Sequence, residues 1–170
     1  MFRVGKVVKT VLIVTPVAIS LYDQVGYVGI VRGRSMQPTL NPASSGWSDL
    51  VLIDRLTVKW RPASRGEVVV FTCPNDPWKT YVKRVIAVEG DVVRPRTHRS
   101  SRVIPKGHCW VEGDNGKSSN DSNYFGAVSL GLIRARVQYV VWPPSRVHHL
   151  QTGLLTDQKE RLTIIDDITT

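Results

Sequence analysis

Two polar residues in otherwise apolar surroundings could form a catalytic pair. Ser35 lies between Gly33 and Pro38, a combination typical of a constrained turn on which a hydroxyl group can project. Lys83 lies in the segment 80–89, where strand alternation makes it the only charge on a face otherwise fit for burial. A buried lysine loses its proton more readily, and a neutral amine beside a serine hydroxyl can serve as its general base. Together the two residues would support nucleophilic hydrolysis.

Each residue also has a plainer interpretation, which the pattern alone favours. A serine at such a position is more often only a turn residue, and a lysine on an edge strand can extend its amine into solvent. Other kinds of site fail on spacing. Residues 113–118 end like a phosphate-binding loop, but the first glycine of that motif would have to replace Val111. The four histidines lack metal-ligand spacing with the two cysteines, so we expect no metal and no cofactor.

The elements that must position these residues are short and extended. Runs rich in valine and isoleucine, separated by Gly, Pro, Asn and Asp, occupy residues 29–32, 49–54, 67–72, 80–89, 91–96, 108–112 and 133–142. Many short strands with regular turn signals favour a closed or nearly closed antiparallel sheet. We therefore expect a mainly β fold, with a compact antiparallel β-barrel-like domain after an N-terminal membrane helix.

The N-terminal segment combines basic and apolar residues. Arg3, Lys6 and Lys9 precede the apolar run 11–22, and no acidic residue stands before Asp23. A membrane-spanning helix needs about 20 mostly apolar residues, so this run is a marginal span. It could be a single anchor, a cleaved targeting peptide or an arm packed on the domain, and the lack of a clear cleavage site favours the anchor. The basic residues would keep the N-terminus on the positive-inside side of the membrane.

The chain of 170 residues is long enough for one domain with appendages. We expect residues 1–25 to be the basic and apolar anchor and residues 26–146 to be the catalytic domain. Residues 147–170, which follow a Pro-Pro pair, would be a tail that is partly helical and carries no recognisable chemistry.

The net charge of +9 indicates nucleic acid, an anionic membrane or an acidic partner without choosing among them. No nucleic-acid recognition motif is found and aromatic residues are only 8%, so we expect no nucleic-acid partner. Part of the charge precedes the apolar run. Another part lies between Val92 and Val111, where five basic residues occur without an acidic one. This segment is either a solvated hairpin loop or, as we expect, a contact with an anionic membrane surface.

Three sequence blocks, taken in order, resemble the blocks of the type I signal peptidases. The run Ser35-Met36-Gln37-Pro38-Thr39 resembles their nucleophile block. Residues 83–91 (KRVIAVEGD) resemble their lysine block, and residues 113–115 with 118–122 (GDN and SSNDS) resemble their third block. Any one block would be a weak signal, whereas the ordered set is specific.

The resemblance implies a membrane-anchored serine endopeptidase with a Ser/Lys dyad and a mainly β catalytic domain. By motif position, Ser35 is the nucleophile and Lys83 is the general base. Ser119 stands where a family serine hydrogen-bonds the lysine and holds its amine toward the nucleophile. Asp121 stands where a family aspartate supports that loop.

Within this family, residues 104–114, 125–132 and 142–144 are similar to the mitochondrial inner membrane peptidases. That similarity implies a single-pass protein of the inner membrane whose catalytic domain faces the intermembrane space. Its substrates would be precursor proteins that carry sorting signals. The implied partners are a homologous peptidase subunit, in a heterodimer, and the lipid bilayer.

Two departures from the family pattern keep alternatives open. Some members have a hydroxyl oxyanion donor where this chain has Gly33, and some have an arginine where it has Asn123. The alternative function is a non-catalytic subunit that keeps the fold and stabilises a homologous peptidase subunit. A bacterial or endoplasmic reticulum enzyme is the alternative location, and glycosylation of the sequon at Asn120 would favour the secretory route.

Overall fold

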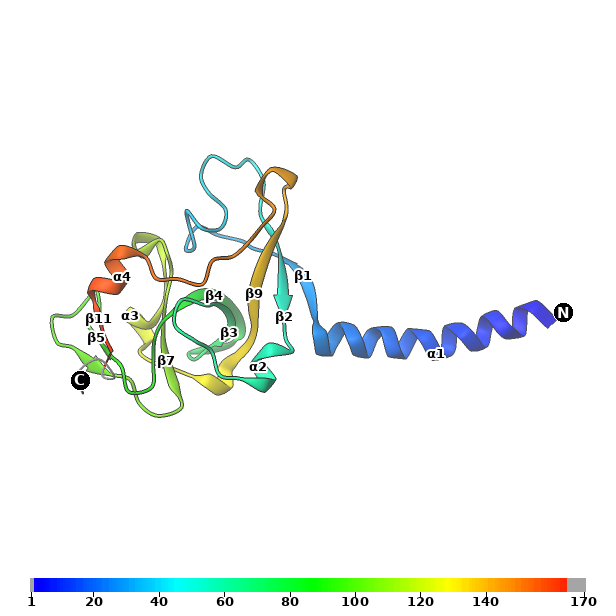
Figure 1. The fold of residues 1–170 in the computed structure, drawn as a ribbon, viewed down its shortest axis with the longest axis horizontal. Helices are drawn as coiled ribbons and strands as arrows, with labels where there is room; N and C mark the ends of the chain where they lie inside the picture. Colours follow the sequence, from blue (N-terminus) through cyan, green and yellow to red (C-terminus); the bar gives the residue numbers. More distant parts are fainter. Residues whose placement is uncertain (1, 165–170) are drawn as a thin grey trace.

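The protein consists of a β-rich body and a long N-terminal helix that extends away from it (Figure 1). The computed structural model describes the backbone of residues 2–164, with the side chains of residues 5–16 and 25–164. Helix α1 (Phe2–Val25) leads directly into strand β1 (Gly26–Ile30). The apolar side chains described on α1, between residues 7 and 14, are exposed. Over the described residues, none of the helices combines the length and the apolar character needed to cross a lipid bilayer.

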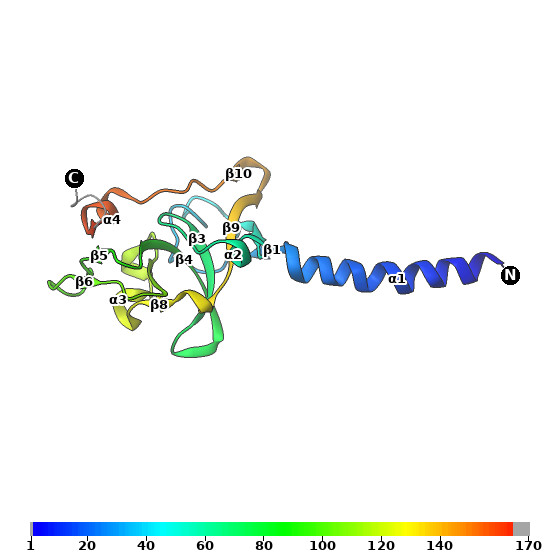
Figure 2. The ribbon, with the colours of Figure 1, turned by 60° about the horizontal axis from the view of Figure 1, so that its bottom comes forward.

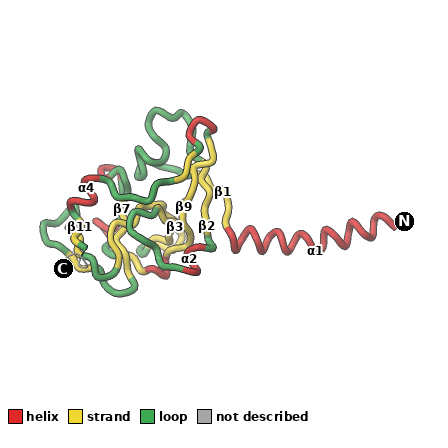
Figure 3. Tube along the Cα trace, viewed as in Figure 1, coloured by secondary structure: helices red, strands yellow, loops and turns green. Residues whose placement is uncertain are grey.

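The body is built on one antiparallel sheet (Figure 3). Its further strands are β2 (Leu50–Asp54), β3 (Val68–Cys73), β4 (Asp76–Val88), β7 (His108–Glu112), β8 (Val128–Ser129), β9 (Ile133–Trp142) and β10 (His148–His149). The strand order is β1-β2-β9-β3-β4-β7-β8, with β10 paired to β9. All of these pairs are antiparallel, so the expected mainly β, antiparallel architecture is confirmed.

The sheet does not close into a barrel. Strands β1 and β8 are the two ends of the strand order, and among the described residues they do not pair with each other. Closure requires two edge strands that can pair along their length in a consistent register. Strand β8 has only two residues, and these pair with β7. The expectation of a closed or nearly closed sheet is therefore wrong.

A smaller sheet attaches the C-terminal residues to the body. Strand β11 (Leu162–Thr163) pairs with β5 (Val92–Val93), and β5 pairs with β6 (Arg102–Val103). The chain between β9 and helix α4 (Thr156–Glu160) crosses the body from the end near α1 to the opposite end, as two views agree (Figures 1 and 2). The basic loop between β5 and β6 lies at the end of the body away from α1.

Short helical turns connect these strands and complete the body. They are α2 (Thr57–Trp60), α3 (Ser122–Phe125) and the 3-10 turns Gly116–Ser118, Leu130–Leu132 and Pro144–Arg146. Three clusters of buried apolar side chains form the core. One of them holds Met36 and Leu40, from the loop after β1, against Val51 and Val140 of the large sheet. This packing fixes the loop that carries Ser35.

Candidate active site

The loop after β1 turns sharply and presents Ser35 above the core. Gly33 has a φ of +91°, a backbone conformation that residues with a side chain rarely adopt. Met36 and Leu40 are 2% and 0% exposed, so both ends of the following turn are anchored in the core. Ser35 itself is only half-buried. The loop therefore holds a serine at the surface on a backbone that is fixed from below.

Hydrogen bonds among Asn41, Asp49 and Arg146 hold the base of this loop. Asn41 and Asp49 exchange two hydrogen bonds: the backbone N–H of Asn41 donates to Asp49 Oδ2 at 2.8 Å, and that of Asp49 donates to Asn41 Oδ1 at 2.7 Å. The Asn41 side chain also donates to the carbonyl of Val31 at 2.8 Å. Asp49 is fully buried and accepts hydrogen bonds from Arg146 Nε at 3.1 Å and Nη2 at 3.0 Å. None of these supporting residues was predicted from the sequence.

Strand β4 brings Lys83 to the serine. Lys83 lies opposite Val69 of β3 and is 3% exposed, so its side chain is buried and does not extend into solvent as the pattern alone favoured. Its Nζ is 2.8 Å from Ser35 Oγ and donates at 3.1 Å to the carbonyl of Val82. The Tyr81 ring lies beside it, with the ring centroid 5.2 Å from Nζ. The structure thus brings the predicted nucleophile and the predicted base within hydrogen-bonding distance.

The surroundings of Lys83 favour its neutral form. Burial lowers the pKa of Lys83 from 10.5 to about 8, because the ammonium loses hydration there. The negative charges of Asp121 and Asp114 act in the opposite direction and raise this pKa. A substantial fraction of the amine is therefore neutral near physiological pH and can accept a proton from Ser35.

The third block lies directly behind the serine. The backbone N–H of Asn115 donates to the carbonyl of Ser35 at 2.9 Å. Gly113 has no room for a side chain, because a Cβ there would overlap Ser119 Oγ on one side and the Ser35 carbonyl oxygen on the other. This close approach places the backbone of the third block against the nucleophile turn.

Asp121 organises the third block. It caps helix α3 by accepting a hydrogen bond from the N–H of Asn123 at 3.1 Å. Its Oδ2 accepts two more, from Ser119 Oγ at 2.6 Å and from the N–H of Gly113 at 3.0 Å. Among the described contacts, no hydrogen bond joins Ser119 to Lys83, so the contact implied by the resemblance is not present here. Asp121 therefore joins Gly113, Ser119 and Asn123 through these hydrogen bonds, and its supporting role stays a prediction.

Two arginines that sequence reasoning missed complete the charge pattern. Arg84, next to Lys83 on β4, makes a buried bidentate pair with Asp114, with Nε–Oδ1 at 2.9 Å and Nη2–Oδ2 at 2.7 Å. Arg96 lies 4.0 Å from Asp121 Oδ2 through its Nη1. Some family members have an arginine where this chain has Asn123, so the sequence did not show which cation would pair with Asp121. In the structure that cation is Arg96. Only the alternation of β4 could have indicated that Arg84 points to the opposite face from Lys83.

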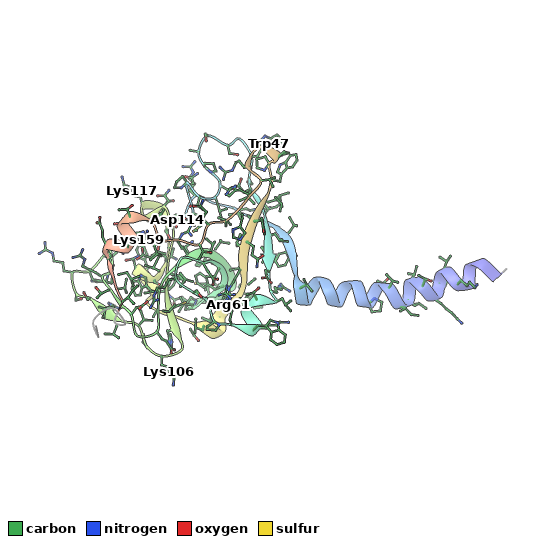
Figure 4. All side chains as sticks on the ribbon, in the orientation of Figure 1. Trp47, Arg61, Lys106, Asp114, Lys117 and Lys159 are labelled. Carbon is green, nitrogen blue, oxygen red and sulfur yellow. The ribbon has the colours of Figure 1, made fainter. Side chains whose placement is uncertain are left out.

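Two open cavities flank the nucleophile turn and share Gly33. The first has a volume of about 370 Å³ and reaches both Ser35 and Lys83; it is bordered by Tyr27 and Gly29 of β1, by Val31 just after that strand and by Tyr81 of β4. The second has a volume of about 520 Å³ and is bordered by Arg34, Pro42 and Trp47. Trp47 is 69% exposed and lies at the edge of the body (Figure 4). A polypeptide could therefore pass the serine from one cavity to the other.

The family model described as signal peptidase, peptidase S26, matches residues 4–99 and 95–142 of the chain. These matched segments include the nucleophile turn, the lysine strand and the third block.

Several mitochondrial inner membrane protease subunits are similar to the chain over most of its length. Mitochondrial inner membrane protease subunit 2 of Mus musculus is 44% identical over 147 residues, which cover 86% of this chain and 84% of that protein. The subunit 2 protein of Saccharomyces cerevisiae is 39% identical over 157 residues, covering 86% and 88%. Mitochondrial inner membrane protease subunit 1 of Mus musculus is 35% identical over 150 residues, covering 86% and 84%.

Proposed function

The chain belongs to the signal peptidase family, peptidase S26, and we propose that it is a catalytically active subunit of a mitochondrial inner membrane protease. The observation that carries the proposal is the 2.8 Å separation of Ser35 Oγ from a buried Lys83 Nζ whose pKa is lowered to about 8. Both residues stand at the edge of a cavity that could hold an extended peptide. The reaction would be hydrolysis of a peptide bond through an acyl-enzyme on Ser35.

In the first step the neutral amine of Lys83 accepts the hydroxyl proton of Ser35 as Oγ attacks the scissile carbonyl carbon. The tetrahedral intermediate collapses, the C–N bond breaks, and the ammonium of Lys83 gives its proton to the leaving amine. In the second step Lys83 takes a proton from water, the resulting hydroxide attacks the ester, and the proton returns to Ser35. The enzyme is regenerated and one water molecule is consumed.

The oxyanion that forms in each step needs hydrogen-bond donors. The backbone N–H of Ser35 is positioned to supply one, because its turn is fixed by Met36, by Leu40 and by the hydrogen bond from Asn115. Gly33 has no side chain that could supply a second. A single preorganised donor can contribute about 3 kcal/mol to transition-state stabilisation, so the rigidity of this turn matters.

An extended substrate segment fits the geometry of β1. Among the described strands β1 pairs only with β2, so no second strand is paired along its other edge. Peptides commonly bind by adding a strand to such an edge. Tyr27, Gly29 and Ile30 of β1 border the cavity at Ser35, as does Val31, which follows the strand. The proposed substrates are the sorting signals of precursor proteins that enter the intermembrane space.

The location and the partners are proposed from the names of the relatives and from α1. The relatives are named as inner membrane proteases with a subunit 1 and a subunit 2, which supports a heterodimer of this chain with a homologous subunit 1. Basic residues and exposed apolar side chains occur together in α1, which supports residues 1–25 as the single membrane anchor. The catalytic domain would then face the intermembrane space.

The proposal is tested in cells whose own copy is replaced by Ser35→Ala or by Lys83→Met. The N-termini of intermembrane-space proteins are then determined by mass spectrometry. We expect a set of proteins to keep their sorting segments in cells that carry either variant. In cells that carry the wild-type chain the same proteins should lose these segments. If deletion of the chain blocks processing but Ser35→Ala does not, the chain is a non-catalytic subunit that stabilises its partner, and the proposed activity is wrong.

A further inference from the structure

The C-terminal residues 150–163, here called the strap, lie across the body and end against the back of the third block (Figures 1 and 2). Leu150 is 4% exposed and belongs to the core cluster under the nucleophile turn. Gln158, in α4, is fully buried, and Arg161 is 9% exposed. Polar side chains that are buried to this extent have specific hydrogen-bond partners. These partners show which parts of the body the strap holds.

Arg161 makes a buried bidentate ion pair with Glu112 at the end of β7. Its Nη2 is 2.7 Å from Glu112 Oε2 and its Nη1 is 3.0 Å from Oε1. Glu112 is fully buried and also accepts a hydrogen bond from Trp110 Nε1 at 2.9 Å. Burial acts to raise the pKa of Glu112, but hydrogen bonds from Arg161 and the charge of Arg96 hold it below its usual value. Arg96 Nη2 also lies 3.0 Å from Glu112 Oε2, so replacement of Arg161 would leave this buried carboxylate with one cationic partner in place of two.

A continuous chain of contacts leads from Glu112 to the dyad. Asn123 Nδ2 donates both to Glu112 Oε1 at 3.0 Å and to Asp121 Oδ1 at 2.9 Å. Asp121 in turn holds Ser119 Oγ and the N–H of Gly113, which lie against Ser35. The links from Glu112 to Ser119 and Gly113 are hydrogen bonds between buried or half-buried groups, and the last link is the close approach of Gly113 to the Ser35 carbonyl. A shift of Glu112 would therefore be passed to the backbone behind the nucleophile.

The strap has a second point of contact, at the arginine–aspartate pair beside the dyad. Gln158 Nε2 donates to Asp114 Oδ1 at 3.4 Å, and the carbonyl of Gln151 accepts from Arg84 Nη1 at 3.3 Å. Asp114 also accepts a hydrogen bond from Thr39 Oγ1, in the nucleophile loop, at 2.5 Å. The strap thus contacts both acidic groups of the third block, one directly and one through Glu112.

We propose that the strap is part of the catalytic apparatus, with Arg161 as a positioning residue that holds the third block against Ser35 and Lys83 through Glu112 and Asn123. This inference rests on the proposed peptidase function. The competing interpretation is that the strap stabilises the fold and nothing more. The two interpretations differ in what happens to molecules that remain folded when Arg161 is replaced.

The pH profile separates these interpretations. The charged and titratable groups that face Lys83 are Tyr81 on its own strand and Asp121 and Asp114 of the third block, which are paired with Arg96 and Arg84. A loosened third block would admit water, and hydration of Lys83 would raise its pKa toward the ordinary value, since burial is the largest cause of its shift. A smaller folded fraction would lower the rate equally at every pH and shift nothing.

The experiment compares Arg161→Gln, Arg161→Lys and the wild type as full-length chains in detergent, cleaving a peptide that spans a processing site found in cells. Lys159→Gln is the matched control, because Lys159 is an exposed strap residue that loses the same charge (Figure 4). We expect Arg161→Gln to lower kcat by about tenfold to a hundredfold with little change in KM, and to move the acidic limb of the profile to higher pH. Arg161→Lys should recover part of the loss, and Lys159→Gln should match the wild type.

Hydrogen exchange gives a readout that does not depend on activity. The amides of Gly113 and Asn115, which donate to Asp121 and to Ser35, should exchange faster in Arg161→Gln but not in Lys159→Gln. Unchanged protection of these amides would overturn the inference, as would a loss of rate that follows the folded fraction with an unchanged pH profile. If the wild-type chain cleaves nothing while the two amides respond, the proposed function fails and the positioning contact stands.

Discussion

The backbone N–H of Asn115 donates a hydrogen bond to the carbonyl of Ser35 at 2.9 Å, which joins two distant parts of the chain at the reacting group. On the other side of the serine, Lys83 Nζ is 2.8 Å from Oγ. The nucleophile is therefore held through its backbone by one element and approached through its side chain by another.

Activity should depend on the protonation of Lys83. Only the neutral amine can accept the Ser35 proton, and burial lowers the pKa of Lys83 to about 8. We expect kcat/KM to rise about tenfold per pH unit at low pH and to level off above about pH 8. The measurement is the cleavage rate of a short peptide between pH 5 and pH 10. A profile that is flat from pH 5 to pH 8 would contradict a lysine base.

The same shift predicts that Lys83 destabilises the fold at neutral pH. Folding lowers the pKa of Lys83 from 10.5 to about 8. Below about pH 8 the amine is charged in the unfolded chain, and folding must either remove its proton or bury its charge, which lowers the free energy of unfolding. This destabilisation decreases as the pH rises from about 8 and is absent above the ordinary pKa of 10.5. We expect Lys83→Met to raise the free energy of unfolding by up to roughly 3 kcal/mol below pH 8, while cleavage is lost. Urea denaturation at pH 6.5 and at pH 10.5 measures this. An equal effect at both pH values would mean that charge burial is not the cause.

The close approach at Gly113 predicts a steric requirement. A methyl group there would push Ser119 and the Ser35 carbonyl apart, whereas at Gly131 it would make an ordinary contact of 3.6 Å with Ser129 Oγ. We expect Gly113→Ala to lower kcat by about a hundredfold or more and Gly131→Ala to leave it unchanged. The two variants are compared by steady-state kinetics on one peptide. Equal activity of the two would show that the third block need not lie against the serine.

The hydrogen bonds that hold the base of the nucleophile loop predict that Asp49 stabilises the fold, which the sequence did not indicate. Asp49 is fully buried and bonded to Arg146 and Asn41, whereas Asp76 forms an exposed pair with Lys79. We expect Asp49→Ala to lower the free energy of unfolding by about 1–3 kcal/mol and Asp76→Ala to leave it nearly unchanged, because the Asp76 carboxylate is exposed to solvent. Urea unfolding of both variants tests this. Similar losses of stability in the two variants would show that Asp49 does not hold the loop in place.

The sequence located the reacting groups because their signals are local. Turn residues around Ser35 and two-residue alternation around Lys83 made both residues candidates, but the pattern alone favoured a turn serine and a solvent-exposed lysine. The ordered family blocks decided between these interpretations. The strands β7 and β9 begin and end at the predicted residues because their signals are local too. Roles for Ser119 and Asp121 came only from family resemblance.

The supporting ion pairs were not predicted, because each joins residues that only the folded chain brings together. Arg161 reaches Glu112 and Arg146 reaches Asp49 across the body, and many arginines in the sequence could have done so. The strap was also missed, since β11 has only two residues and α4 only five. The open sheet could not be foreseen either, because strand count and turn spacing do not specify whether the edge strands meet.

The central claim is that Ser35 and Lys83 act together to cut peptide bonds, and the most direct measurement is kcat/KM of purified Ser35→Ala and Lys83→Met on a peptide that the wild type cleaves. Circular dichroism and urea unfolding establish that each variant is folded. The account predicts that each single substitution lowers kcat/KM by about 10³-fold or more, and that the double variant is no worse than either, because the two residues act as a unit. Cleavage by either folded variant at the wild-type rate would contradict it.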